Sequence, residues 1–146
     1  MALFTSKVDY ALRALLDLAS QPPGRPAQSR EIASRQSIPE SYLNQLLVVL
    51  RRAGLVKSVR GAAGGYVLGR DPQSIRAADV VRTLHGQDFL AAHAADGTII
   101  PSAWVVRALH DRLTDGVCRE LEKTTLADLK AEVQQLNEAQ SLMLGI

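Results

Sequence analysis

Residues 40–69 read ESYLNQLLVVLRRAGLVKSVRGAAGGYVLG, and this stretch decides the fold. Leucines recur with the spacing of one buried helical face, at Leu43, Leu46, Leu47 and Leu50. Gly54 is of the residue type that ends a helix, so the helix is expected to reach about Ala53. Two short β-type runs, 55–60 and 66–69, flank a glycine-rich turn. The stretch therefore predicts a helix followed by a β-hairpin.

Two further helices are expected before this stretch. Residues 6–20 carry apolar side chains at helical spacing, and the proline-rich segment 21–26 cannot continue that helix. Ser29 is expected to cap a short helix that ends near Arg35. A tight turn at 37–38 follows, with Pro39 as the first residue of the third helix. Helix, helix, turn, helix and hairpin in this order are typical of a winged helix-turn-helix.

The rest of the chain is expected to be helical apart from one loop. A fourth helix is predicted over 75–84, a loop over 85–100, and a long helix from about Ser102 to Lys123. Thr125 with Asp128 resembles a capping box for a last helix over 126–144. The fold class is thus mainly α, with a small β-hairpin wing. Three parts are predicted: a winged helix-turn-helix domain over 1–84, an effector or linker loop over 85–101, and two helices over 102–146.

The outward face of the third helix carries side chains of the types that can read DNA bases. Opposite the leucines lie short hydroxyl, amide, small apolar and arginine side chains: Ser41, Asn44, Gln45, Val48 and Arg52. Amides can bond adenine bidentately and an apolar group can touch a thymine methyl group. Since the N-terminal end of a recognition helix reaches the bases, Ser41, Asn44 and Gln45 are expected at the bases, with Arg51 and Arg52 nearer phosphate. The alternative is an exposed helix that is merely polar.

The hairpin adds positive charge beside this helix. Arg51, Arg52, Lys57 and Arg60 fall within ten residues that contain no acid. An arginine at the tip of a wing can enter the minor groove, where the potential is negative, and glycines let the turn approach a phosphate. A P-loop is excluded, because no Gly-Lys-Ser/Thr follows the glycines and Tyr66 begins a strand. A hairpin turn without function is the other reading.

Charge is divided unevenly along the chain, although the net charge of its 146 residues is only +2. Residues 1–86 hold twelve Lys/Arg against six Asp/Glu, whereas residues 87–146 hold five against nine. The basic half suggests a nucleic acid or an anionic membrane as partner, unless the division is statistical scatter. No apolar stretch is long enough to span a membrane, no basic amphipathic helix could lie on lipid, and no signal peptide is recognised. With a single cysteine, a cytoplasmic location is expected.

The chain resembles the Rrf-two family of bacterial winged helix-turn-helix transcription regulators. The matching stretches are SKVDYALRALLDLA (6–19), REIASRQSIPESYLNQLL (30–47), LRRAGLVKSVRGAAGGYVL (50–68) and TTLADL (124–129). The resemblance implies a homodimer paired through the long helix, for which the candidate contacts are Val106, Leu109, Leu113 and Val117. It places Ser41, Asn44, Gln45 and Arg60 where relatives contact double-stranded DNA. The full predicted DNA-contact set is Ser41, Tyr42, Asn44, Gln45, Arg51, Arg52, Lys57, Arg60 and Gly61.

The sequence also departs from the family's pattern. Sensors in the family carry three cysteines in the loop before the long helix, but residues 85–102 contain none. Asp9 matches an aspartate ligand of the nitric-oxide sensors but has no cysteine partners here. We therefore predict no iron–sulfur cluster, no other cofactor and no metal. The wing reads Ala62-Ala63 where relatives often have Pro-Gly, a departure that bears on the geometry of the wing and its fit to the minor groove.

Several single residues keep two readings. Cys118 is a possible redox thiol, or a cysteine that packs on a dimer helix. His85, His93 and His110 match no metal-binding motif and are expected to be exposed or to pack. Trp104 could line an effector pocket with Phe89, although a core tryptophan is the favoured reading. The last helix carries a short heptad-like seam, which is expected to pack on the dimer or, alternatively, to dock a partner protein.

These observations predict a sequence-specific DNA-binding regulator, a homodimeric repressor on a palindromic operator. The main alternative is a protein-interaction module that kept the fold but lost DNA binding. No nucleophile–base pair, carboxylate pair or cofactor motif is found, so an enzyme is not expected. The effector, a small molecule or a partner protein, is not identified by the sequence.

Overall fold

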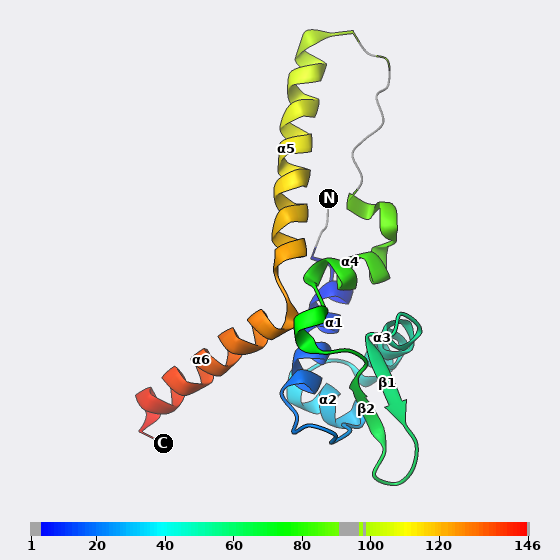
Figure 1. Cartoon of the computed structure of the whole chain (residues 1–146), viewed down its shortest axis with the longest axis vertical. Coiled ribbons are helices and arrows are strands. Elements are labelled where there is room, and N and C mark those ends of the chain that lie inside the picture. The colour runs from blue at the N-terminus through cyan, green and yellow to red at the C-terminus, as the bar shows by residue number, and fades with distance from the viewer. Residues whose placement is uncertain (1–3, 91–96, 98, 146) are drawn as a thin grey trace.

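The structure is a computed structural model that describes residues 4–90, 97 and 99–145. The predicted effector loop, 85–101, therefore lies partly outside the described residues, and His93 lies wholly outside them. The elements in chain order are α1 (Ser6–Ala19), α2 (Ser29–Gln36), α3 (Glu40–Arg52), β1 (Val56–Val59), β2 (Gly65–Leu68), the 3₁₀ helix η1 (Pro72–Ser74), α4 (Ala77–His85), the 3₁₀ helix η2 (Gln87–Leu90), α5 (Pro101–Lys123) and α6 (Leu126–Leu144). Figure 1 shows α1–α4 and the hairpin gathered into one unit, from which α5 and α6 extend in different directions.

The core of this unit lies between α1, α2 and α3. The predicted leucine face of α3 is confirmed, since Leu43, Leu47 and Leu50 are fully buried and Leu46 is nearly so. Leu43, Leu47 and Leu50 join Leu15 of α1, together with an α2 isoleucine, in the main apolar cluster. Burial of such side chains contributes roughly 1.5–3 kcal/mol each, so this face fixes which side of α3 points outward.

The turn between α2 and α3 differs in detail from the expected one. Gln28, not Ser29, is the N-cap of α2, and its backbone N–H donates to Glu31 Oε2 at 2.8 Å. Pro39 is the N-cap of α3 rather than its first residue. Ser37 has φ 54°, a left-handed conformation that ends α2 and turns the chain toward α3.

The wing is a two-stranded antiparallel hairpin with a third backbone neighbour. Val56 pairs with Leu68 and Val59 with Gly65, which confirms the predicted hairpin. On the other edge, Ala27 and Tyr66 exchange two backbone hydrogen bonds of 2.9 and 2.7 Å. The loop before α2 is thus tied to the wing, which fixes the hairpin relative to the helix-turn-helix.

A second apolar cluster joins α5 to the unit. Leu121, near the end of α5, packs with Val8 of α1 and with Ala77, Ala78 and Val81 of α4. The earlier part of α5 lies away from this unit (Figure 1). The expectation of a core tryptophan is wrong for the single chain, because Trp104 lies on this distant part and is 56% exposed.

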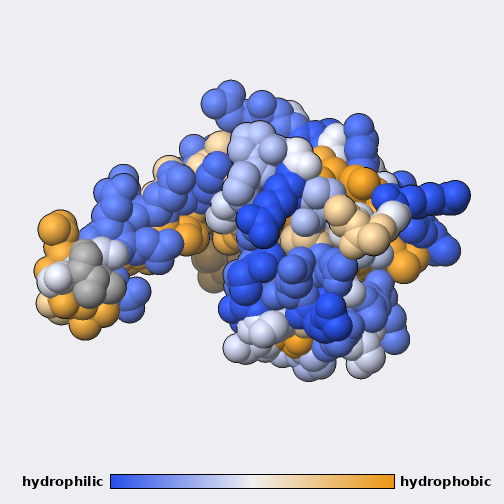
Figure 2. All heavy atoms as spheres, turned by 90° about the horizontal axis from the view of Figure 1, so that it is seen from below, coloured by the Kyte–Doolittle hydropathy of each residue, from blue (hydrophilic) through white to orange (hydrophobic). Residues whose placement is uncertain are grey.

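The last helix also leaves the unit. Leu126 is buried and the first turns of α6 pack on α1 and η1, whereas Leu136 is 71% and Met143 88% exposed. The predicted heptad-like seam therefore has only its first turns packed within one chain. Figure 2 shows apolar residues gathered at the projecting end of α6.

The predicted capping box at the start of α6 is present. The backbone N–H of Thr125 donates to Asp128 Oδ2 at 2.9 Å, and the N–H of Asp128 donates to the Thr125 hydroxyl at 3.1 Å. The bond from the Thr125 backbone, and then that with its side chain, holds the pKa of Asp128 below its ordinary value.

The lowered pKa predicts a pH dependence of stability. A carboxyl whose pKa is lower in the folded state stabilises that state above its unfolded pKa, and this stabilisation is lost as the pH falls through the folded value. Asp128→Asn is therefore expected to flatten the decline of the melting temperature below about pH 4. Thermal unfolding followed by circular dichroism between pH 3 and pH 7 tests this. An unchanged decline in the variant would contradict a role for the Asp128 charge.

Candidate DNA-binding surface

The outward face of α3 is exposed as the sequence predicted. Ser41, Asn44 and Gln45 are all exposed, and Val48 beside them is half-buried. None of these side chains takes part in the core, since the four leucines occupy the opposite side. Ser41, Asn44 and Gln45 thus lie together in the first half of a helix with an open face, which is the arrangement that a major-groove reader needs.

Tyr42 lies differently from its neighbours. Its ring packs edge-to-face on Tyr10 of α1, with centroids 5.7 Å apart, and the guanidinium of Arg13 lies 5.5 Å from the centroid of the Tyr10 ring. Its side chain is half-buried. Tyr42 therefore anchors α3 to α1, and only its exposed part is available for the predicted DNA contact.

Positive charge surrounds this face. Residues 41–70 contain no Asp or Glu and hold five basic side chains: Arg51, Arg52, Lys57, Arg60 and Arg70. All five are exposed. The end of the molecule that carries the wing has a largely hydrophilic surface (Figure 2). A surface with cations and no carboxylates is complementary to a phosphate backbone.

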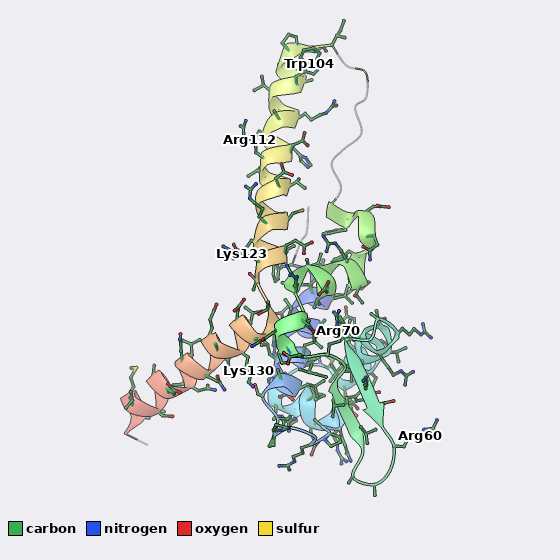
Figure 3. The ribbon with its side chains drawn as sticks, in the orientation of Figure 1. Arg60, Arg70, Trp104, Arg112, Lys123 and Lys130 are labelled. Carbon is green, nitrogen blue, oxygen red and sulfur yellow. The ribbon has the colours of Figure 1, made fainter. Side chains whose placement is uncertain are left out.

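Arg60 projects from the wing near its tip, away from the body of the protein (Figure 3). Gly61 follows it with φ 110° and open space where a Cβ would stand, so the turn can approach a neighbouring molecule closely. Gly64 has a different role, because a Cβ there would lie 2.1 Å from the carbonyl oxygen of Val59. Gly64 therefore serves the internal packing of the wing.

Arg60→Ala is expected to weaken binding to the cognate DNA by roughly 1–3 kcal/mol, because an arginine in a narrow minor groove gains from its negative potential. Lys57→Ala is the matched control, because it removes a cation from the same wing. Loss of a phosphate contact is expected to weaken binding to all DNA sequences about equally. Fluorescence anisotropy with cognate and scrambled duplexes measures both effects. Unchanged affinity and unchanged sequence preference in Arg60→Ala would contradict the assignment of the wing.

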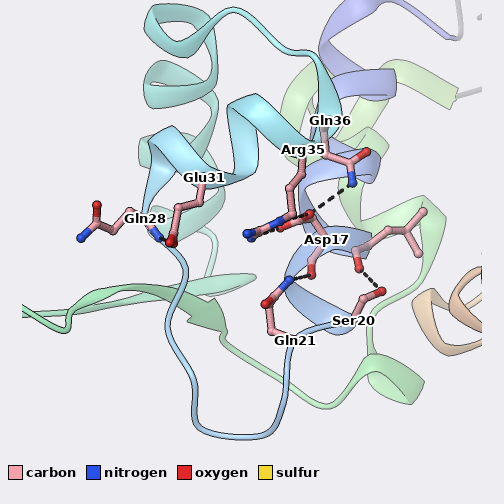
Figure 4. Close-up of polar contacts among 8 residues, drawn as sticks. Asp17, Ser20, Gln21, Gln28, Glu31, Arg35 and Gln36 are labelled. Atoms are coloured by element: carbon pink, nitrogen blue, oxygen red, sulfur yellow. Dashed lines mark hydrogen bonds and ion pairs between the residues drawn. The ribbon is translucent and has the colours of Figure 1, made fainter.

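The helix-turn-helix is held on α1 by a buried carboxylate that sequence reasoning missed. Asp17 is 4% exposed and accepts hydrogen bonds from Arg35 Nε at 2.9 Å, Arg35 Nη2 at 2.8 Å and Gln36 Nε2 at 3.2 Å (Figure 4). The bond to Asp17 raises the pKa of Arg35 above its already high ordinary value, so the guanidinium stays charged. In the sequence, the only sign of this pair is that Asp17 lies among the apolar residues of the inner face of α1.

The candidate sensor residues lie elsewhere. Cys118 is half-buried and packs against the α1–α4–α5 cluster, which fits the packing role without testing the redox role. His85 stacks on Phe89 at 4.3 Å, and Nε2 of His85 lies 3.3 Å from the Thr5 hydroxyl. Across the described ranges, no three His, Cys, Asp or Glu side chains come together as metal ligands. None of the described helices is long and apolar enough to cross a membrane.

Comparisons with known proteins agree with this geometry. The sequence profile of the Rrf2 family, described as iron-dependent transcriptional regulators, matches residues 4–132. The chain is 38% identical over 135 residues to the HTH-type transcriptional regulator CymR of Bacillus subtilis, covering 92% of this chain and 94% of CymR. It is 36% identical over 141 residues to the HTH-type transcriptional regulator IscR of Aliivibrio salmonicida, covering 94% of this chain and 84% of that protein.

Solved structures give the same result. The structure of CymR, the global cysteine regulator of B. subtilis, superposes with a TM-score of 0.78 at 38% identity, over 88% of this chain and 96% of CymR. The structure of T. potens IscR gives 0.75 at 36% identity, over 94% and 90% of the two chains. The mainly helical fold with a two-stranded wing is that of these regulators. The chain belongs to the Rrf2 family and is a DNA-binding transcriptional regulator of the winged helix-turn-helix class, not an enzyme.

Proposed function

We propose that this regulator is a homodimeric repressor that occupies an operator with two half-sites related by two-fold symmetry. The observation that carries the proposal is the exposed face of Ser41, Asn44 and Gln45 on α3, beside an acid-free segment of basic residues. In this proposal Arg51, Arg52 and Lys57 contact phosphates, while Arg60 and Gly61 bring the wing to the minor groove. A dimer presents two such surfaces, and its two-fold axis imposes the symmetry of the operator.

The exposed apolar face of α5 supports the dimer. Val106 is 67%, Leu109 48% and Leu113 62% exposed, and they follow one another by three and four residues. The fourth candidate, Val117, is half-buried and packs on the α1–α4–α5 cluster within its own chain. A face of this kind on a helix that stands away from its own unit fits a helix–helix contact with a second copy.

Replacing Leu109 and Leu113 together by glutamate is expected to dissociate the dimer, because each charge would have to be buried without a partner. Arg112→Glu is the matched control, since Arg112 is exposed on the same turn but outside the apolar row. Light scattering reports the mass, and anisotropy reports DNA affinity. A double variant that keeps the mass of the dimer would contradict the assigned face.

We further propose that the protein works without an iron–sulfur cluster. The full chain has one cysteine, Cys118, and it faces an apolar cluster. Asp9, the match to a ligand position, is paired with Arg13 at 3.2 Å. A visible absorption band with stoichiometric iron after anaerobic purification would contradict this part of the proposal.

The three-part division of the chain also belongs to the proposal. The DNA-binding unit spans 1–84, the linker loop 85–101 and the dimer helices 102–146. The effector would then be a small molecule or a partner protein that acts on the linker, and the site of action would be the bacterial cytoplasm, where the operator lies. The alternative, a protein-interaction module without DNA binding, predicts no affinity for any duplex at low salt.

A further inference from the structure

The elbow between α5 and α6 is fixed to the start of α4 by backbone hydrogen bonds. The N–H of Ala77 donates to the carbonyl oxygen of Thr124 at 2.9 Å, and the N–H of Leu126 donates to that of Ile75 at 2.8 Å. Arg76 and Thr125 form an isolated antiparallel bridge between them. Backbone contacts therefore tie the elbow to the DNA-binding unit.

Two arginines, one of them in this bridge, hold the last turn of α5. Arg82 of α4 forms an ion pair with the carboxylate of Glu122, and Arg76 Nη1 donates to the carbonyl oxygen of Glu122 at 2.7 Å. The side chains of Arg82 and Glu122 are 30% and 39% exposed, so the pair is partly shielded from water. Arg76, Arg82 and Glu122 are called the elbow clamp below.

The elbow clamp lies at the C-terminal end of the long helix α5. The 23 residues of α5 span about 35 Å, and Leu121, next to Glu122, is buried against α4. Beyond this anchored end the helix stands away from the unit, and its exposed apolar residues lie on the distant half (Figure 1). The angle at which α5 leaves the unit is thus determined where α4 holds it.

We propose that Arg82 and Glu122 are positioning residues that determine the spacing between operator half-sites. The inference rests on the proposed homodimer, in which the paired α5 helices join two DNA-binding units. A change of about 10° in the direction of α5 displaces a point ~20 Å along the helix by roughly 3.5 Å, close to the rise of one base pair. An ion pair that limits this change of direction limits the tolerated spacing without touching DNA.

The test begins with the full-length protein and a random-sequence duplex library, from which the wild type selects its paired half-sites. A panel of duplexes then carries these half-sites at the selected spacing, one base pair shorter and one longer. The variants are Arg82→Ala, the milder Glu122→Gln and the charge exchange Arg82→Glu with Glu122→Arg. In the two single variants, the affinity ratio between selected and altered spacing is expected to fall by up to about fivefold, the upper limit for one partly exposed ion pair. The charge exchange is expected to restore the wild-type affinity ratio.

A matched control separates positioning from general loss of structure. Lys123→Ala removes an ion pair with Glu120 at 2.9 Å that lies wholly within α5 and does not reach α4, and it is expected to keep the wild-type ratio. Affinity for a single half-site is expected to stay within about twofold in every variant. The inference is overturned if both single variants keep the wild-type ratio, or if single half-site affinity falls as much as the ratio does. If the wild type does not select paired half-sites, the proposed dimer itself is contradicted. This outcome is seen in the first step, before any variant is made.

Discussion

Replacing Asn44 and Gln45 together by alanine is expected to reduce affinity for the cognate operator by about 2–6 kcal/mol, since each bidentate amide–base contact contributes roughly 1–3 kcal/mol of discrimination. Both side chains are exposed and alanine favours helix, so the fold is expected to persist. Anisotropy with cognate and scrambled duplexes measures the change. The loss is expected on the cognate duplex, with little effect on the scrambled one, because phosphate contacts carry non-specific binding.

Gln134 and Gln135 provide the control for this prediction. They are adjacent exposed amides on α6, on the part that projects from the DNA-binding unit. Replacing both by alanine is expected to leave the affinity for both duplexes unchanged. If the Asn44 and Gln45 variant binds the cognate duplex as tightly as this control does, α3 is not the reading helix.

Arg35→Ala is expected to lower the free energy of unfolding by about 2–3 kcal/mol. The substitution leaves the carboxylate of Asp17 buried with Gln36 as its remaining side-chain donor, and an unpaired buried charge is strongly destabilising. The expected loss lies below that of a fully buried pair because the Arg35 side chain is 41% exposed. Urea denaturation followed by circular dichroism measures it.

Arg30→Ala is the matched control on the same helix. Arg30 is exposed. Among the described residues, its side chain forms one hydrogen bond, to Gln28 two residues away. Its removal is expected to change the free energy of unfolding by less than about 0.5 kcal/mol. Equal losses for Arg30→Ala and Arg35→Ala would contradict the role given to the Asp17–Arg35 pair.

Much of the DNA-binding unit was predictable because local rules determine it. The leucine spacing of α3 placed its buried face, and that face alone left Ser41, Asn44 and Gln45 outward. The hairpin followed from two short runs around glycines, and the cap of α6 from Thr125 and Asp128. In each case the deciding residues lie within a few positions of one another.

The missed features depend on contacts between residues far apart in sequence. Asp17 meets Arg35 across 18 residues, and Arg82 meets Glu122 across 40. Helical spacing cannot show which of many charged residues will pair. Trp104 was expected in a core because tryptophan is usually buried, yet it lies on the part of α5 that stands away from its own unit.

The central claim is sequence-specific binding of double-stranded DNA, and one titration tests it most directly. The purified protein is titrated by fluorescence anisotropy into the duplex upstream of its own gene and into a scrambled duplex, at two salt concentrations. The account predicts tight, preferential binding to the upstream duplex that weakens steeply as salt rises, since phosphate contacts release counterions. Absence of binding to either duplex at low salt would contradict it.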